Sequence, residues 1–398
     1  MAAVAIDEGA DPHGSAPLAF GPSAMPQLLE GQALVAAAGA HPADGFAAAI
    51  TAQGVQTFIA NVTSRLAVLN AGGHAFPVTI DDGGYGRSYV ASPHSAYVAY
   101  ARREMALMGL KRGRAAASTA IAAADALLRA ARVNRIVHLD NWLLSTNLHG
   151  GWRGEGLAAM RQMLTARFPD HWLAIRSLDD WGSPALLATA RDDGWLLLPA
   201  RQIWVVDDVE RQWRCTRDAA YDQKLLDRSG LRITMDAALT PELATQIAGL
   251  YRQLYLGKYS PLNPDFTAPF IDLLQQTGWM RYHLAHDRHG ALVAVAGVLA
   301  RGDVMTVPVL GYDLARPQDE GLYRIACHLC SMDAASRGLR LHQSAGAAEF
   351  KRRRGARPQI EYMAVYARHL PAYRRAPLYA LRTALERWVV PMMQSNQW

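Results

Sequence analysis

Short apolar runs alternate with stretches of helical periodicity along the first half of this chain, which is the pattern of an α/β protein. The pattern predicts a helix from residue 51, strands at 64–70, 76–80 and 88–91, and a long helical region at 94–132. Strand 135–140, helix 155–167, strand 171–176, helix 183–192 and strand 195–207 are expected to follow. Such an alternation indicates a mainly parallel sheet that is covered by helices.

The second half repeats this order with different residues. Helix 241–254, a loop at 258–264 and helix 268–276 lead into strands at 280–287, 291–299 and 304–310. Helix 321–336, strand 339–344, helix 347–353 and strand 361–367 complete the half. Two halves of like order indicate a structural duplication, although no residue-level repeat accompanies it.

The pattern also divides the chain into segments. We expect a partly ordered leader at 1–45, an N-terminal domain at 46–210, a linker at 211–235, a C-terminal domain at 236–372 and an amphipathic helix at 373–398. The apolar stripe of that last helix, from Leu378 to Val389, is surrounded by arginines. A helix of this kind packs on its own domain, joins a dimer or lies on a membrane surface, and we favour packing on its own domain or on a dimer partner over the membrane surface.

Composition places the protein among globular chains. With 398 residues and 51% hydrophobic content, it can bury the cores of two or three domains. The first eleven residues lack the pattern of a signal peptide, and the longest clean apolar run, 291–300, is half of what a bilayer requires. Only three cysteines are present, which argues for a reducing compartment. We therefore expect a cytoplasmic protein.

Positive charge is concentrated near the C-terminus. The net charge of the chain is +6, and residues 351–375 contain eight basic side chains against a single acid, Glu361. A patch of this kind suits the phosphates of a cofactor, an acidic carrier protein, RNA or an anionic membrane. The alternative is a basic face that is simply solvated.

The segment Cys327-His328-Leu329-Cys330 has the spacing of a metal site. It lies within a helical pattern, however, and no second pair of ligands accompanies it. We therefore interpret it as core packing and assign no metal.

The order of elements in each half resembles the GNAT acyltransferase fold, and the pair of halves resembles the Fem-type tandem-GNAT group. In the C-terminal half, the resemblance rests on the antiparallel strands of 280–310 and on Gly346-x-x-x-Phe350-Lys351, which is similar to the Gly-x-x-x-[Phe/Tyr]-Lys signature of that group. In the N-terminal half, residues 183–195 resemble a late GNAT helix that leads through Gly194-Trp195 into a strand. The resemblance implies two GNAT-like domains, each a mixed sheet with a splayed parallel strand pair.

In that family, the pantetheine arm of acyl-CoA lies between the splayed strands, and the diphosphate lies on a glycine-rich loop at a helix start. Residues 151–156 keep the Gly154-x-Gly156 spacing but lack the leading Arg or Gln, and residues 313–321 lack the pattern apart from Gly321. Glycines before a helix are also a routine way to start one. Which half holds CoA stays open, with a preference for the C-terminal half, where Gly346, Lys351 and Arg352 are added candidates for cofactor binding.

Acyl transfer to an amine requires a base, an oxyanion donor and often an acid for the thiolate. His342 is the first candidate for the base, with Ser344 on the same face of its strand. Asp313 ends the preceding strand, where α/β sheets present functional groups. Tyr312 and Tyr362 are candidate donors to the thiolate. The alternatives are a hydrogen-bonded structural histidine, a turn cap at Asp313, and packing for the tyrosines.

Lysine usage adds one clue, because the chain has four lysines beside 37 arginines. Lys258, next to Tyr259, is a candidate substrate contact, and Lys351 is a candidate anchor for a phosphate or carboxylate. Chance survival of these lysines is the alternative.

We thus expect an N-acyltransferase that uses acyl-CoA or an acyl-carrier-protein thioester as cosubstrate, with no tightly bound cofactor and an amine as acceptor. The alternatives are a Fem-type transferase that uses aminoacyl-tRNA, and a non-catalytic GNAT pair that serves as a scaffold. An acyl carrier protein and a second copy of the chain are candidate partners, tRNA and a membrane surface are less favoured, and DNA is not expected. The acceptor is not specified by the sequence.

Overall fold

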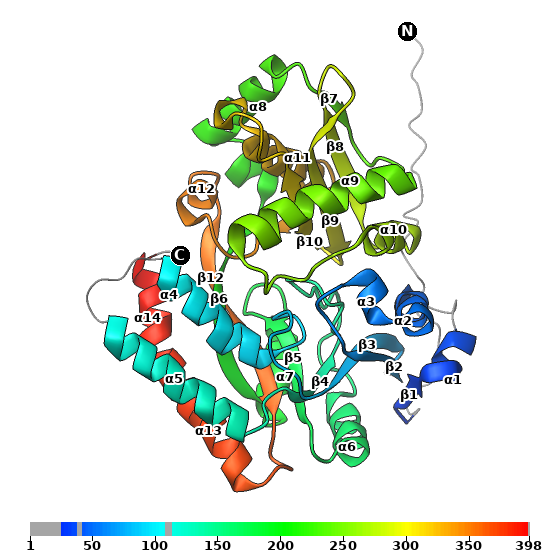
Figure 1. Cartoon of the computed structure of the whole chain (residues 1–398), viewed down its shortest axis with the longest axis vertical. Coiled ribbons are helices and arrows are strands. Elements are labelled where there is room, and N and C mark those ends of the chain that lie inside the picture. Colours follow the sequence, from blue (N-terminus) through cyan, green and yellow to red (C-terminus); the bar gives the residue numbers. More distant parts are fainter. Residues whose placement is uncertain (1–24, 38–41, 108–113, 397–398) are drawn as a thin grey trace.

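The computed structural model describes residues 25–37, 42–107 and 114–396, and all strands in this part of the chain belong to one twelve-stranded sheet (Figure 1). The two halves of the chain lie at opposite ends of the sheet, and β6 and β12 run between them. Helices cover both faces, so that buried apolar clusters lie on each side. The expected mixed α/β architecture is confirmed.

The N-terminal half follows most of the predicted elements. Its strands are β1 (Gln27–Glu30), β2 (Arg65–Ala71), β3 (His74–Asp82), β4 (Arg135–Leu139), β5 (Trp172–Leu178) and β6 (Leu196–Val206). Its helices are α1 (Gly31–Ala36), α2 (Pro42–Gln53), α3 (Val55–Phe58), α4 (Tyr100–Leu107), α5 (Arg114–Ala130), α6 (Leu157–Arg167) and α7 (Pro184–Asp192). The strand expected at 88–91 is wrong, because these residues form turns. Of the expected leader, residues 1–24 and 38–41 lie outside the described residues, whereas β1 pairs with β2 at the sheet edge.

The C-terminal half differs from prediction mainly at its start. Residues 211–235, expected as a linker, contain helix α8 (Arg217–Arg228) and strand β7 (Arg232–Thr234). The later elements are α9 (Pro241–Arg252), a π-helical turn (Gln253–Tyr259), α10 (Ala268–Gln276), β8 (Arg281–His286), β9 (Leu292–Arg301) and β10 (Val304–Tyr312). They are followed by α11 (Leu322–Ser336), β11 (Arg340–His342), α12 (Ala348–Arg352), β12 (Arg357–Tyr366), α13 (Ala372–Ala384) and α14 (Val390–Asn396).

Strand order makes the sheet nearly symmetric about the β6–β12 pair. The order is β1-β2-β3-β4-β5-β12-β6-β11-β10-β9-β8-β7. Only β4–β5 and β10–β11 are parallel, and every other neighbouring pair is antiparallel. The expectation of a mainly parallel sheet is therefore wrong, whereas the mixed sheet with one parallel pair in each half is present.

The two halves exchange their last strands. β12 follows the elements of the C-terminal half but lies between β5 and β6, and the end of β6 pairs in turn with β11 at Val205 and Val206. Strands β6 and β12 are long and pair with each other at the centre of the sheet. Their register extends from Arg357 opposite Val205 to Val365 opposite Leu196. A single sheet therefore joins the two domains that were predicted to be divided at residue 210.

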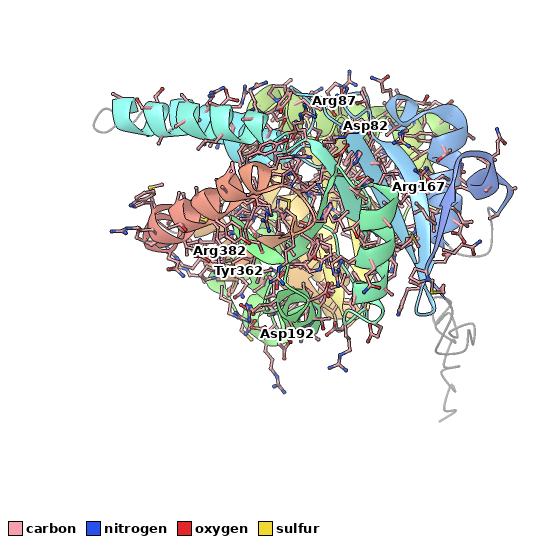
Figure 2. The ribbon with its side chains drawn as sticks, turned by 90° about the horizontal axis from the view of Figure 1, so that it is seen from below. Asp82, Arg87, Arg167, Asp192, Tyr362 and Arg382 are labelled. Atoms are coloured by element: carbon pink, nitrogen blue, oxygen red, sulfur yellow. The ribbon has the colours of Figure 1, made fainter. Side chains whose placement is uncertain are left out.

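The C-terminal helices pack on the N-terminal half. α13 lies beside α5, and its Leu378 is buried with apolar residues of β4, β5 and β12 (Figure 1). Near it, Figure 2 shows Tyr362 of β12 on the same side of the molecule as Arg382 of α13 and Asp192 of α7. No helix of the described residues is both long and apolar enough to cross a membrane.

The basic segment 351–375 does not form one surface. Lys351, Arg354 and Arg374 are buried, and Arg374 donates to the carbonyl oxygens of Ala131 and Asp170. Strand β12 lies between the two ends of the segment, and its ten residues span about 30 Å, because a strand rises about 3.3 Å per residue. The single basic patch inferred from the sequence is therefore wrong, since a count along the chain ignores where the strand carries each charge.

Asp81, near the end of β3, gives the fold a testable pH dependence. Its buried carboxylate accepts a hydrogen bond from Ser64 Oγ at 2.8 Å, and burial raises its pKa from 3.8 to about 7, although Ser64 and the nearby Arg87 oppose the shift. Figure 2 labels Arg87 and the adjacent Asp82. Between pH 4 and pH 7 the folded chain therefore holds a proton that the unfolded chain has released, so stability falls as pH rises.

We expect Asp81→Asn to remove this dependence. From pH 5 to pH 8, the wild-type protein should lose about 2 kcal/mol of unfolding free energy relative to the variant. Urea denaturation of both proteins at the two pH values measures the difference, and other titrating groups cancel in the comparison. An equal change in both proteins would contradict the assignment.

Candidate functional site

The parallel ladder between β10 and β11 is short. It joins Val304, Met305 and Thr306 to Arg340, Leu341 and His342, yet β10 continues to Tyr312. The register of β10 against β9 shifts between Thr306 and Val309, as a β-bulge produces. Beyond His342 the chain instead follows β6, with hydrogen bonds between Trp204 and residues 343 and 344. Among the described residues, the last six positions of β10 thus have no strand partner on this edge.

The equivalent place in the N-terminal half is occupied by its own chain. After β4, the loop returns to β5, and His149 Nε2 lies 2.8 Å from the carbonyl oxygen of Arg176. The Asn147 amide donates to Ser177 Oγ in the same place. Asp140 holds His149 from the other side through Nδ1 at 2.8 Å and also contacts Arg301 at 3.1 Å. A ligand cannot add to this strand edge without displacing the loop.

Ser344 connects several of the predicted residues at the separation of β10 from β11. Its backbone adopts a left-handed conformation with a φ of 58°. Its amide donates to His342 Nδ1 at 3.1 Å, its carbonyl oxygen accepts from Lys351 Nζ at 3.2 Å, and its hydroxyl accepts from Arg201 Nη1 at 3.2 Å. A non-glycine residue in this conformation is strained and needs the surrounding contacts to hold it.

His342 is placed as a donor rather than a base. Because Nδ1 accepts the Ser344 amide, the ring proton of the neutral form must lie on Nε2. Burial lowers the pKa of His342 from 6.5 to about 4, even though Glu361 lies 3.9 Å from Nε2. Nε2 is buried and has no hydrogen-bond partner among the described residues. A ring in this state is poorly suited to accept an ammonium proton.

Lys351 is committed to its own backbone. Its ammonium group donates to the carbonyl oxygens of Gln343, Ser344 and Ala345 at 2.6, 3.2 and 2.8 Å. Burial lowers its pKa from 10.5 to about 7. All three ammonium protons have acceptors, so Lys351 fixes the strained loop before α12 and is not free to anchor a phosphate.

Two arginines complete this centre, Arg176, which is buried, and Arg201, which is partly buried. Arg201 of β6 makes a bidentate contact with Glu361 of β12 at 2.8 and 3.0 Å and also donates to the carbonyl oxygen of Ser145 at 2.8 Å. Arg176 of β5 donates to Asn141 Oδ1 and the carbonyl oxygen of Leu144, both at 3.1 Å. Burial lowers the pKa of Arg176 to about 10. Burial alone would raise the pKa of Glu361, but the charge of Arg201 holds it below its ordinary value.

Sequence reasoning missed Arg176, Arg201 and Glu361 as site residues. A usable signal was present, since Arg201 and Glu361 are each the single charged residue within an otherwise apolar or neutral stretch of a predicted strand. A charge in a buried strand requires a partner, which is how these residues can be found.

The free edge of β10 ends at a group of aromatic side chains. Lys258 Nζ donates to Tyr312 Oη at 3.1 Å and lies 6.0 Å from the centre of the Tyr259 ring. Tyr323 of α11 packs against Tyr312 with ring centres 5.9 Å apart. Lys258, Tyr259 and Tyr312 are thus brought together as candidates. Asp313 follows directly, but its carboxylate caps a turn by accepting from the Ala315 amide at 3.0 Å.

His342 and Asp313 do not converge. His342 pairs with Thr306, and Asp313 follows Thr306 by seven residue steps, which is about 23 Å along a strand. The expectation that they share one site is wrong, because the parallel register sets His342 against the start of β10 and Asp313 follows its end. Tyr362 does not join this site either, because it packs against the apolar cluster that includes residues of α7 in the N-terminal half.

A cavity of about 530 Å³ lies between α8, α11 and α12. Arg324, from the first turn of α11, and Arg353 and Arg354, which follow α12, contribute guanidinium groups to it. The remaining lining residues are Asp218, Tyr221, Leu225, Arg228, Glu349 and Phe350. Arg352, predicted for this role, is exposed and does not line the cavity.

The predicted glycines have local backbone roles. Gly321 precedes α11 with a φ of 64°, and a side chain there would meet Leu225 of α8. Gly154 has a φ of 102° and faces Thr189, whereas Gly156 and Gly346 have positive φ without a close neighbour of this kind. Each glycine therefore has a conformational reason to be present.

The Cys327–Cys330 segment lies in α11, as its periodicity predicted. Cys330 Sγ donates to the carbonyl oxygen of Ala326, and His328 Nε2 lies 2.9 Å from Gln223 Oε1. Within the described part of the chain, no three His, Cys, Asp or Glu side chains are grouped as a metal site would require.

Known protein-family models do not match the sequence, and a search of the curated proteins finds no match. Among solved structures, the L-PGS of Bacillus licheniformis overlaps 62% of this chain and 81% of its own, with a TM-score of 0.44 and 12% identity. FemX overlaps 57% and 79%, with a TM-score of 0.42 and 10% identity. A tandem GNAT protein from the clavulanic acid biosynthesis pathway overlaps 78% and 84%, with a TM-score of 0.37 and 14% identity.

Because these TM-scores lie below 0.5, we take the class of this protein from its own strand pairings. Each half has antiparallel strands, one parallel pair, a helix after the first strand of that pair and an antiparallel finish. This is the order of a GNAT fold, and the chain contains two copies of it in tandem.

Proposed function

We propose that this protein is an N-acyltransferase that moves an acyl group from a thioester to an amine, and that the thioester binds in the C-terminal half. The observation that carries the proposal is the separation of β10 from β11 beyond Thr306 and His342. A free strand edge offers N–H and C=O groups to the amide-bearing arm of a thioester. The arginines of the nearby cavity are held by ion pairs, Arg324 and Arg354 with Asp222 and Arg353 with Asp218, and we propose that their remaining N–H groups bind phosphates.

The reaction forms one bond and breaks one. The amine nitrogen attacks the carbonyl carbon of the thioester, the C–N bond forms and the C–S bond breaks. The nitrogen loses a proton and the departing thiolate gains one. Because transfer is direct, we assign no covalent enzyme intermediate.

Tyr312 is our candidate donor of the proton to the thiolate. Its oxygen accepts a hydrogen bond from Lys258, so its own O–H is free to point toward a ligand on the β10 edge. The hydrogen bond to Tyr312 raises the pKa of Lys258, which keeps this lysine charged beside the phenol. We assign no side chain as base, since His342 is unsuited. An amine that arrives unprotonated gains a positive charge on attack, and we assign the release of its proton to solvent, from which the Tyr312 phenolate is reprotonated.

The occupied edge in the N-terminal half supports a single thioester site in each chain. His149 and Asn147 already hold β5 at the equivalent place. In this proposal, the N-terminal half binds no second thioester. It contributes β5 and β6, the two strands beside β12, together with their arginines Arg176 and Arg201.

We expect purified protein to bind one class of thioester and to release free thiol when an amine is added. Acetyl-CoA, long-chain acyl-CoA and acylated carrier proteins form the panel, with thermal stability and free thiol as readouts. Arg324→Gln should raise the KM for a CoA thioester about tenfold, because a charge-assisted hydrogen bond to phosphate is lost. Arg211→Gln, at an 88% exposed arginine outside the cavity, is the control.

A binding titration should reach saturation at one thioester per chain. Absence of any thermal shift and of thiol release across the panel would rule out the proposal. Release that depends on added aminoacyl-tRNA and is sensitive to RNase would assign the donor to the Fem-type alternative instead.

A further inference from the structure

The centre around Ser344 holds more positive than negative charge. Arg176, Arg201 and Lys351 are buried or nearly so, and Glu361 is the carboxylate that pairs with one of them. Among the described residues, Arg176 donates to carbonyl and amide oxygens, and no carboxylate forms an ion pair with it; Glu361, which Arg201 holds, acts on it only at longer range. Buried charge without a counterion is costly, so this arrangement is suited to an anion.

The nearest other acids are already engaged. Asp140 is paired with Arg301 and His149. Asp179 accepts from the amides of Trp181 and Gly182, and burial raises its pKa to about 6. Neither carboxylate balances Arg176.

One face of this centre is accessible. The Arg201 side chain is 21% exposed, and Ser344 and Ser145 beside it are half-buried. Arg201 has five guanidinium N–H groups, and four of them are engaged. The Nε proton is directed at Glu361, the two Nη2 protons are directed at Glu361, the Ser145 carbonyl oxygen and the Thr146 hydroxyl, and one Nη1 proton is directed at Ser344. The remaining N–H is on Nη1. The Ser344 hydroxyl accepts from the same Nη1 and can turn its own proton outward.

We propose that Arg201 Nη1 and the Ser344 hydroxyl bind an anionic group, carboxylate or phosphate, that is carried by the amine acceptor. This inference rests on the proposed function, because it assigns the substrate of the same site. Glu361 holds the guanidinium in a fixed orientation, so the donors are positioned before the ligand arrives. Arg176 supplies further positive charge.

The position also sets a length for the acceptor. His342 is the last residue that pairs with β10, opposite Thr306, and Ser344 follows it by two residues at the start of the separation, whereas Tyr312 ends β10. An acceptor that reaches both places should separate its amine from its anionic group by a chain of several atoms.

The first test measures anion binding without any thioester. Glutarate and inorganic phosphate, at constant ionic strength, should raise the thermal stability of the wild-type chain by a few degrees, whereas neutral glutaramide should not. The response should be lost in Ser344→Ala and in the double variant Arg201→Leu/Glu361→Leu, which removes both charges of the pair together. Arg357→Gln, an exposed arginine of β12 paired with Asp207, should keep the response. Equal responses to glutarate and glutaramide, or an unchanged response in the double variant, would overturn the inference.

The second test uses thiol release with a ladder of ω-amino acids of four to eight carbons beside the alkylamines of the same length. The best amino acid should exceed its matched alkylamine about tenfold in kcat/KM. Ser344→Ala should reduce this ratio, whereas Arg357→Gln should leave it unchanged. Aminoalkyl phosphates of equal length distinguish phosphate from carboxylate. Equal rates for acids and alkylamines would reject the inference but keep the transferase. No thiol release with any amine would reject the proposed transferase function. The anion-binding response of the first test is measured without a thioester, so its outcome is judged separately.

Discussion

Arg201→Leu should lower the free energy of unfolding by about 3–5 kcal/mol, because it leaves the buried Glu361 carboxylate without its guanidinium partner. The loss should be larger at pH 8 than at pH 5. Without Arg201, the pKa of Glu361 is governed by burial, which raises it, so protonation at the lower pH removes part of the cost. Urea denaturation at the two pH values measures both effects.

The double variant Arg201→Leu/Glu361→Leu should recover more than half of this loss, because it removes both charges from the interior. Arg357→Leu is the matched control on the same strand pair. Its contact with Asp207 is solvent-exposed, and exposed pairs contribute about 0–1 kcal/mol. A single Arg201 variant as stable as the Arg357 variant would show that the pair does not hold β6 against β12.

Tyr312→Phe should lower kcat for thioester aminolysis about 100-fold and leave the KM for the thioester nearly unchanged. The variant keeps the ring against Tyr323 but removes the hydroxyl that Lys258 contacts. Thiol release, followed with the thioester that the panel identifies, measures the effect. Lys258→Gln should have a smaller effect of the same kind, since it acts through the phenol.

Tyr379→Phe provides the control, because Tyr379 is half exposed on α13 and far from β10 in the fold. A thioester with a more acidic thiol needs less help from a proton donor, so the Tyr312 variant should recover part of its rate with such a substrate. Wild-type kcat in Tyr312→Phe with an ordinary alkyl thioester would show that the thiolate takes its proton from elsewhere.

Much of the local structure was predictable because it depends on side-chain spacing. The predicted helix 268–276 and strand 135–140 agree closely with α10 and β4, since a 3.6-residue or two-residue period is visible within one short segment. The segment of helix α8 was wrongly predicted to be a linker, because the exposed face of this helix carries many charges and its apolar face is narrow. Its contact with α11, through Asp222 and Arg324 at 2.6 Å, gives no signal in the sequence around it.

The candidate site was predicted in part. His342, Ser344 and Lys351 do lie together, because the loop from β11 to α12 is short enough to bring them into contact. Their roles were not readable from sequence. Lys351 is held by three carbonyl oxygens and the His342 ring is held by an amide, and these contacts depend on a loop conformation with positive φ at Ser344 and Ala347. No residue pattern identified that conformation.

The order of helices and strands, its duplication and the resemblance to tandem GNAT proteins could be predicted from the amino-acid sequence, because each is a property of neighbouring residues. Three other features appear only in the folded chain: β12 lies in the other half of the sheet, the basic segment is dispersed, and Arg201 meets Glu361 across 160 residues of chain. These outcomes depend on which distant strands pair, and pairing is selected by the burial and hydrogen bonding of the whole sheet rather than by any one segment.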